Sequence, residues 1–269
     1  MIICNTIFDI ILAIFIDNQI KRMYNSLVFI FMKRVNVMEY LYEMHAHTVE
    51  VSTCAVATAE EMIKYYEDKG YTGIVSTNHM NSSTFSRVGL ADAPWDKKVD
   101  HFLKGYEILK AAAGDKYKVI LGMEINFYNH PNDYLVYGIT EEILRSHGDL
   151  MAMGPKKFSK LAHENGLLMI QAHPFRRDSI IEDWKILDGY EIFNGNPRHH
   201  SGNETAEFWA KVHNKSIVTS GSDFHEKDDT ALGGIYFKKI IETNEELLEE
   251  LRKGDYRLKI TEIPYTRPE

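Results

Sequence analysis

Two histidines one residue apart, His45 and His47, are the side chains of this chain best suited to binding a cation. Alternate side chains of a β-strand point to the same face, so this pair directs two imidazole rings toward one point. Neutral imidazole is the commonest protein ligand of divalent metals. Because the chain has 12 histidines, such a pair arises by chance fairly often and predicts a metal site only weakly on its own.

Further ligand-type side chains stand where other short apolar runs end. Glu124 closes such a run, and a carboxylate buried there must be paired, hydrogen-bonded or metal-bound. The proline after His173 favours an extended backbone at that histidine. Asp223 and His225, in the segment Gly-Ser-Asp-Phe-His, again lie on one side of the chain. The whole set comprises His45, His47, His79, Glu124, His173, Asp223 and His225.

The elements that must position these residues alternate regularly along the chain. Short runs rich in β-branched and aromatic residues predict strands at residues 40–45, 73–77, 118–124, 134–137, 167–172, 189–193, 216–220 and 234–237. Amphipathic helical patterns separate most of them. Thr58 and Glu61 form a capping box that begins a helix running to Lys69, and the other helices are predicted at 94–113, 155–165, 201–213 and 243–253.

This alternation predicts an α/β fold, with a parallel sheet and the helices outside it. A chain of 269 residues is long enough for one large domain, and about seven strand–helix units suffice to close a barrel. In such barrels the chemistry sits at the carboxyl ends of the strands, which is where the ligand-type residues fall. We therefore predict a TIM-like barrel with its active site at that end.

Composition restricts the partners and the compartment. The apolar fraction of 44% is typical of a globular protein, and the net charge of −8 argues against a nucleic-acid backbone as the main partner. The two cysteines, Cys4 and Cys54, form neither a disulfide framework nor a zinc motif, which favours a reducing cytoplasm. Cys54 has no paired base in the sequence, and we interpret it as structural.

The first 38 residues differ from the rest. Their apolar stretches, 2–16 and 27–32, are shorter than the ~20 residues that a membrane span needs, and the pattern is not that of a signal peptide. A packed helix, a membrane-surface anchor and an upstream extension ahead of a start at Met38 all fit. We predict that residues 1–38 are an apolar extension outside the native fold, that residues 39–269 form the barrel, and that no transmembrane span is present.

The motifs resemble, in order and spacing, those of the PHP (polymerase and histidinol phosphatase) family of metal-dependent phosphoesterases. The resemblance rests on Met-His-Ala-His-Thr, Ser-Thr-Asn-His, Gly-Met-Glu, His-Pro and Gly-Ser-Asp-Phe-His, and it covers residues 39–240. It implies a distorted (β/α)7 barrel with two or three divalent ions at the carboxyl ends of the strands. Mixed histidine and carboxylate ligands suit zinc, iron or manganese.

The resemblance also implies which residues bind each ion. The first ion would be bound by His45, His47, Glu124 and Asp223. Glu124 would bridge to the second ion, which His173 also binds. The third ion would be bound by His79, His225 and an acidic residue soon after the histidine pair.

Three positions depart from the family pattern. Ser52 stands where many members have aspartate, and we take Glu50 as the substitute ligand of the third ion. Asp133 stands where many have histidine; we take it as a ligand of the second ion, with His130 as the competitor. Asn78 replaces the common aspartate of Thr-Asp-His.

The activity implied is hydrolysis of a small phosphorylated metabolite by metal-bound hydroxide. The substrate would be a nucleotide, a sugar phosphate or a histidinol-phosphate-like monoester, and Glu124, Asp223 and His225 would be the catalytic residues. Arg176 is predicted to bind the substrate phosphate, because the planar guanidinium group binds two oxygens at once, and Asn194 is predicted to lie on the same rim. Arg177 is the competing anchor.

Two other functions remain open from the sequence. A metal-dependent amidohydrolase shares the barrel, the first histidine pair and a late aspartate, but that pattern does not require Glu124 or the histidine of Asp-Phe-His. A non-catalytic binding module would keep the barrel and lose turnover, and the residues at Ser52 and Asp133 are the features that favour it.

Overall fold

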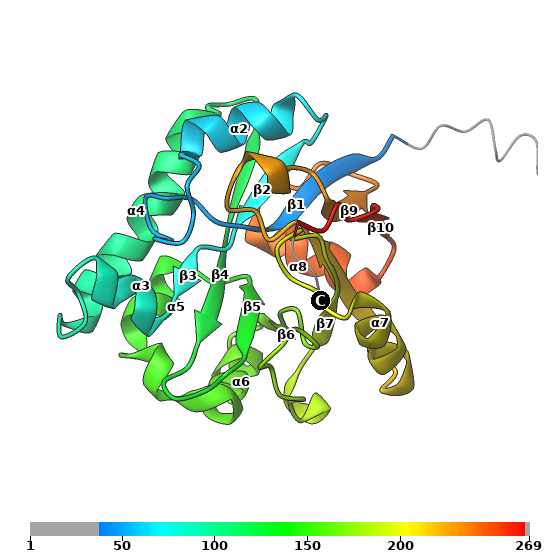
Figure 1. The fold of residues 1–269 in the computed structure, drawn as a ribbon. Helices are drawn as coiled ribbons and strands as arrows, with labels where there is room; N and C mark the ends of the chain where they lie inside the picture. The colour runs from blue at the N-terminus through cyan, green and yellow to red at the C-terminus, as the bar shows by residue number, and fades with distance from the viewer. Residues whose placement is uncertain (1–37, 267–269) are drawn as a thin grey trace, which may run out of the picture. The chain divides into compact units, whose positions relative to one another are not determined.

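The computed structural model describes residues 38–266, in which strands lie at the centre and helices surround them (Figure 1). The strands are β1 Tyr40–Ala46, β2 Gly73–Ser76, β3 His79–Met80, β4 Lys118–Asn126, β5 Asp133–Tyr137, β6 Leu168–Gln171, β7 Gly189–Asn194, β8 Ile217–Gly221, β9 Gly233–Phe237 and β10 Arg257–Ile260. The helices are α2 Ala59–Glu67, α3 Ser82–Arg87, α4 Trp95–Ala113, α5 Glu141–Ser146, α6 Gly154–Glu164, α7 Asn203–Val212 and α8 Asn244–Lys253.

The strands form one sheet in the order β10-β9-β1-β2-β4-β5-β6-β7-β8, with β3 beside β4. Parallel pairs join β1 to β2, β2 to β4, β6 to β7 and β7 to β8. The sheet curls so that the segment after β8 is hydrogen-bonded to the end of β1. The Phe224 amide donates to the His45 carbonyl (3.1 Å), and the His47 amide donates to the Phe224 carbonyl (2.9 Å). The predicted α/β barrel is therefore confirmed, as a nearly closed one.

The parallel arrangement predicted for the whole sheet is wrong at β5, which runs antiparallel to both β4 and β6. Residues 127–132 are all that joins β4 to β5, and a parallel return needs a crossover of a dozen or more residues. The reversal places Asp133, the first residue of β5, opposite Asn126 at the end of β4. β9 is likewise antiparallel to β1.

The main helices begin and end close to the predicted residues. The Thr58 side chain accepts a hydrogen bond from the Glu61 amide, and the Glu61 side chain accepts one from the Thr58 amide, so the capping box at α2 is confirmed. Helix α4 follows Pro94 and stops at Gly114, whose φ of 59° is easiest for glycine. The sequence missed α3, α5, β3 and β10, which are six residues or shorter and carry too few apolar positions to show a period.

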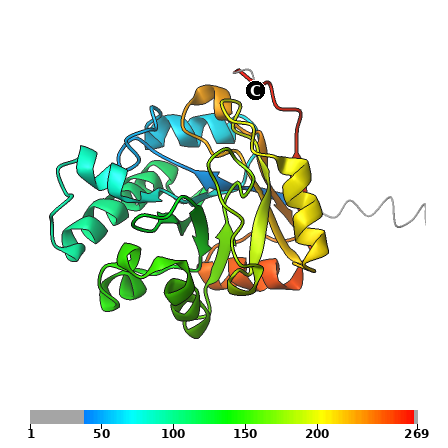
Figure 2. The same ribbon diagram turned by 60° about the horizontal axis from the view of Figure 1, so that its bottom comes forward.

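A buried cluster ties the strands to α8. It joins Tyr42, Ile170 and Phe237 on three strands to Leu247 and Leu251 on the helix. Figure 2 shows α8 lying across one end of the strands. Burying each such side chain stabilises the fold by about 1.5–3 kcal/mol, so α8 holds that end together and leaves the opposite end for the ligand-type residues.

The prediction for residues 1–38 as a separate extension lies outside the described residues, except for Met38 at the boundary, and it stays a prediction. Among helices within 38–266, none is long and apolar enough to cross a membrane.

Candidate metal centre

The predicted ligands come from several strands and meet at one end of the barrel. His45 is in β1 and His47 follows it; His79 begins β3; Glu124 lies near the end of β4; Asp133 begins β5; His173 follows β6; Asp223 and His225 follow β8. Four overlapping groups have their ligand atoms within 4.8 Å of one another. They are His45–His47–Glu124, His45–His173–Asp223, Glu124–Asp133–His173 and His47–His79–His225.

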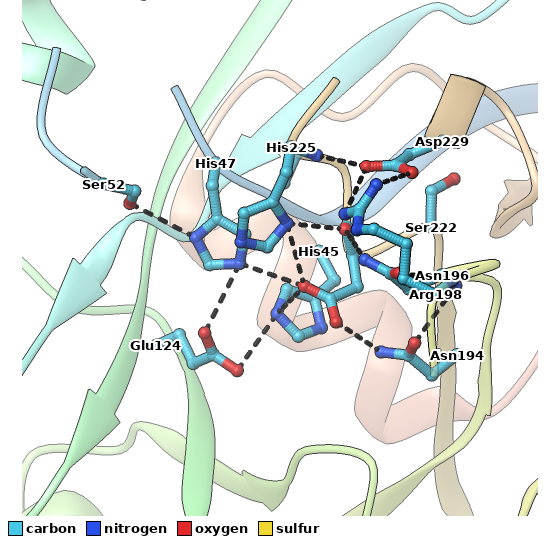
Figure 3. A network of polar contacts seen from close by, with 12 residues as sticks. His45, His47, Ser52, Glu124, Asn194, Asn196, Arg198, Ser222, His225 and Asp229 are labelled. Atoms are coloured by element: carbon cyan, nitrogen blue, oxygen red, sulfur yellow. Dashed lines mark hydrogen bonds and ion pairs between the residues drawn. The ribbon is translucent and has the colours of Figure 1, made fainter. Parts of the chain in front are cut away.

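Glu124 is the centre of this arrangement. Its Oε1 lies 3.1 Å from His45 Nε2 and 3.2 Å from His173 Nε2. Its Oε2 lies 2.7 Å from His79 Nδ1 and 3.4 Å from His47 Nε2. The side chain is 1% exposed, and Figure 3 shows it directed at His45 and His47. One carboxylate thus faces four imidazoles with both of its oxygens, as a bridging ligand would.

Asp223 faces the same histidines from the other side of the barrel. Its Oδ1 lies 3.5 Å from His45 Nε2 and 3.4 Å from His47 Nε2. Its backbone has a φ of 52°, an uncommon value for a residue other than glycine. The Ser222 amide and hydroxyl donate to the buried carboxylate of Glu43, at 2.9 and 2.5 Å.

Asp133 rather than His130 completes the group around His173. Asp133 Oδ2 lies 3.9 Å from His173 Nε2, whereas His130 is turned toward Glu182, at 3.5 Å, and accepts from the Asn132 amide. The extended backbone predicted for His173 is wrong, because its φ is 28°. A strained backbone of this kind is common where surrounding contacts fix a functional side chain.

Glu50 belongs to none of the four groups, and its role as the acidic ligand of the third ion stays a prediction. Its Oε1 accepts from the Ala59 amide at 3.0 Å, at the beginning of α2, where a carboxylate is favoured by the exposed amides. The imidazoles of His47, His79 and His225 do come together, with ring centroids 4.1–5.8 Å apart.

Several buried polar atoms of the centre make no hydrogen bond of good geometry among the described residues, although His79 Nδ1 and Glu124 Oε2 lie at ion-pair distance from each other. They are His45 Nε2, His47 Nε2, His79 Nδ1, His173 Nδ1 and Glu124 Oε2. An unpaired buried polar atom costs about 1–3 kcal/mol, so a cluster of them needs an explanation. Three of these nitrogens and the Glu124 oxygen face one another across the centre, and divalent cations between them would use the free lone pairs. The residues present therefore fit a metal centre.

Glu124 and Asp223 are ionised in the buried centre, which suits cation binding. Burial opposes ionisation of Glu124, but His45 and His79 outweigh it and hold its pKa well below the usual value. Burial also opposes ionisation of Asp223, and His45 and Arg176 hold its pKa well below the usual value. For Asp133, burial and the charge of Glu124 raise the pKa to about 6.

Glu191 in β7 is a supporting residue that the sequence analysis missed. Its Oε1 lies 2.9 Å from His45 Nδ1, and its Oε2 accepts from the His173 amide at 2.9 Å. A carboxylate on the far nitrogen of a histidine fixes which nitrogen is free to bind metal. The available signal was a glutamate inside a buried apolar strand, which is the reasoning that singled out Glu124.

Of the two residues predicted to bind phosphate, one reaches the cavity. Arg176 lines it and donates from Nη2 to Asp223 Oδ2 (2.7 Å) and Asn194 Oδ1 (2.9 Å). Asn194 is fully buried and does not line the cavity, and its amide nitrogen donates to Glu191 and Asp223. The prediction that Asn194 contacts phosphate is therefore not supported, because its polar atoms are used to hold its neighbours. The competitor Arg177 is exposed.

The cavity above the centre has a volume of about 180 Å³. Its lining includes Glu124, Asp133, His173, Asp223, Arg176, Arg198, His79, His225 and Cys54. Arg198 reaches it from the loop after β7 and forms two hydrogen bonds with the buried Asp229, at 2.6 and 2.8 Å, which tie that loop to the one that carries His225 (Figure 3).

Cys54, interpreted from the sequence as structural, also lines this cavity. Its thiol is in hydrogen-bonding contact with the side chains of His225 and His79. Burial raises the pKa of the thiol, but the two histidines outweigh that effect and lower it to about 6.

Comparison with solved structures places this arrangement among known folds. PsfC from Pseudomonas syringae matches with a TM-score of 0.61 and 12% identity, over 83% of this chain and 92% of that one. A two-domain protein from Bacteroides vulgatus, described as containing a predicted PHP-like metal-dependent phosphoesterase, matches with a TM-score of 0.54 and 15% identity, over 83% of this chain and 65% of that one. The chain shares the fold of these two proteins. The resemblance inferred from the motifs is thereby confirmed at the level of the fold.

A third structure that matches is that of the lesion-specific endonuclease PfuEndoQ from Pyrococcus furiosus, with a TM-score of 0.53 and 15% identity over 82% of this chain. This chain spans 58% of the endonuclease and 65% of the Bacteroides protein, less than two thirds of each. No family model and no curated protein matches the sequence. At these identities the matches show the fold alone, and the chemistry has to be argued from the centre itself.

Proposed function

We propose that this protein is a metal-dependent phosphoesterase that hydrolyses a small phosphorylated metabolite. The observation that carries the proposal is the position of Glu124, whose two oxygens face four imidazole nitrogens from three segments of the barrel within 2.7–3.4 Å. A buried carboxylate shared in this way is the arrangement expected between two or more cations. The fold that the chain shares with the Bacteroides protein supports the same reading.

The residues proposed to hold the ions follow the groups found at the centre. His45, His47, Glu124 and Asp223 would hold one ion, and Glu124, Asp133 and His173 would hold a second. His79 and His225 would contribute to a third. Divalent ions supply positive charge for a phosphoryl group and make water a stronger nucleophile at neutral pH. Zinc, iron and manganese all suit these ligands.

The chain's own residues would orient the reaction. Glu124 and Asp223 keep their negative charge in a buried centre, and this charge holds the cations at fixed positions. His225, at the edge of the cavity, is proposed as the third catalytic residue. Arg176 lines the same cavity, and a guanidinium group there is suited to binding two phosphate oxygens.

The substrate is proposed to be a small monoester, such as a nucleotide, a sugar phosphate or a compound resembling histidinol phosphate. A cavity of about 180 Å³ accommodates a phosphoryl group and a small part of what it is attached to. The net charge of −8 argues against stable binding of a nucleic acid. A cytoplasmic location, inferred from cysteine usage, remains part of the proposal.

A screen of phosphorylated metabolites tests this function. The protein is freed of metal with a chelator, loaded in turn with zinc and manganese, and inorganic phosphate release is measured. Glu124→Gln, purified in parallel, serves as the control for contaminating phosphatases. We expect phosphate release by the loaded protein and none above background by the variant.

Other outcomes would replace the proposal with one of the alternatives. Opening of cyclic amides without phosphate release would indicate an amidohydrolase. Cleavage of an oligonucleotide in preference to every small ester would make a nucleic acid the substrate. A protein that binds its metals fully and turns over none of these compounds would be a binding module.

A further inference from the structure

The group formed by His47, His79 and His225 contains no acidic residue, although the sequence predicted one there. His47, His79 and His225 offer ligand nitrogens within 4.8 Å of one another. Glu50, the expected acidic ligand, is bonded instead to the Ala59 amide at the beginning of α2. The group therefore needs another anionic ligand from within the chain if it is to hold a cation strongly.

Cys54 occupies the place where that ligand would be. Its side chain lines the cavity together with His79 and His225 and is in hydrogen-bonding contact with both. Aspartate, glutamate and cysteine are the anionic side chains that bind divalent metals, and only the thiolate of cysteine is a soft ligand.

The backbone holds the Cys54 segment against both histidines. The amides of Val56 and Ala57 donate to the His225 carbonyl, at 2.9 and 3.2 Å. On the other side, the His79 amide donates to Ser52 Oγ at 3.0 Å. Residues two positions away from Cys54 on each side are thus fixed to the two histidines that its thiol contacts. The segment that carries the exposed Cys54 is thus anchored on both sides of it.

A second observation supports a cation at this position. His47 is fully buried, and its Nε2 has no hydrogen-bond partner among the described residues. Its ring lies against those of His79 and His225, with centroids 4.1 and 4.5 Å away. A buried imidazole nitrogen without a partner is costly, and a cation bound beside the three rings would remove that cost.

We propose that Cys54 is a metal ligand, and that with His79 and His225 it makes the outer cation position a sulfur-containing one. A thiolate favours zinc over manganese or magnesium, whereas the carboxylate-rich inner positions accept all three. The inference deepens the proposed function, because it rests on the same centre binding metal, and it interprets Cys54 differently from the structural role inferred from the sequence.

Cobalt spectroscopy of the full chain separates this inference from the proposed function. Metal-free protein is titrated with Co²⁺. Visible d–d bands report cobalt bound anywhere in the centre, and a near-ultraviolet charge-transfer band reports a cobalt–thiolate bond. Cys54→Ser is compared with the wild-type chain and with Cys4→Ser, which controls for the other cysteine of the sequence.

We expect the charge-transfer band in the wild type and in Cys4→Ser, and its loss in Cys54→Ser while the visible bands remain. Visible bands without the charge-transfer band in the wild type, or a band that survives in Cys54→Ser, would overturn the inference and leave the proposed function standing. Absence of all bands would overturn both.

The variant Cys54→Asp provides a second measurement. It replaces the soft ligand with a hard oxygen ligand at the same point of the loop. We expect competition titrations to show weaker zinc binding and tighter manganese binding at the weakest site than in the wild type. Unchanged affinities for both metals would mean that Cys54 lies beside the position without binding to it.

Discussion

At the scale of single residues, the chemistry of this protein depends on side chains that are buried and yet charged. Burial disfavours the charged form of Glu124 and Asp223, and neighbouring histidines restore it for both. Two further buried glutamates contact the neighbours of these carboxylates: Glu191 contacts His45, and Glu43 accepts a hydrogen bond from Ser222. These two glutamates contact the ligands or their neighbours rather than the cavity, so their effect on metal binding is indirect and can be measured separately from catalysis.

Glu191→Gln tests that indirect effect. The glutamine side chain keeps the shape but removes the charge that orients His45, so we expect metal affinity to fall about 10–100-fold. Chelator competition measures the affinity without any substrate. Glu207→Gln, on the exposed surface of α7, is the matched control and should leave the affinity unchanged. Equal affinities in both variants would mean that His45 is oriented by other contacts.

Arg176→Ala tests the phosphate anchor. Loss of the guanidinium group is expected to raise KM for a phosphate substrate about tenfold, equivalent to about 1.4 kcal/mol, with a smaller change in kcat. Steady-state kinetics measure both, and metal content is determined alongside because Arg176 contacts Asp223. Arg177→Ala, at the adjacent exposed position, should behave as the wild type. If Arg177→Ala raises KM instead, the anchor is the neighbouring arginine.

At the scale of elements, the order in which strands and helices follow one another determines where the ligands meet. The sequence predicted the principal strands and the capped helices, because apolar period and capping signals are local. It did not predict the reversal of β5, although the short connection at residues 127–132 carried that information. That reversal explains why Asp133, at the beginning of a strand, joins residues from the ends of others.

Thr58→Ala tests whether α2 depends on its capping box. The change removes the hydroxyl that accepts from the Glu61 amide, and it is expected to lower the free energy of unfolding by about 1 kcal/mol. Urea denaturation measures the change, and Thr58→Ser, which keeps a hydroxyl, is the control. Metal content should stay the same in both variants. A loss of metal in Thr58→Ala alone would show that α2 helps to hold the neighbouring 47–57 segment.

At the scale of the whole molecule, the centre exists because distant parts of one barrel meet at a single end. The motifs brought most of these residues to notice, since most of them stand at the end of an apolar run. The sequence did not predict the contacts of Glu50 and Asn194. Spacing shows which residues are near a strand end, but not which neighbours a side chain meets in the fold: Glu50 accepts from the Ala59 amide, and Asn194 donates to Asp223.

Deleting residues 1–37 tests whether the centre needs anything before the first strand. All proposed ligands lie between His45 and His225, so we expect the shortened chain to bind the same number of metal ions and to keep its activity. Elemental analysis and the phosphate-release assay measure the two properties. A shortened chain that folds but binds fewer ions would mean that the first residues contribute to the barrel or to its centre.

The most direct test of the account is the metal content of the wild-type chain beside that of Glu124→Gln, both purified without chelators and then saturated with zinc. Elemental analysis of the wild type should give two or three ions per chain, and the variant should lose at least one of them together with its activity, since a bridging carboxylate serves more than one ion. Less than one ion per wild-type chain, or equal content in the two proteins, would contradict the metal centre proposed for this barrel.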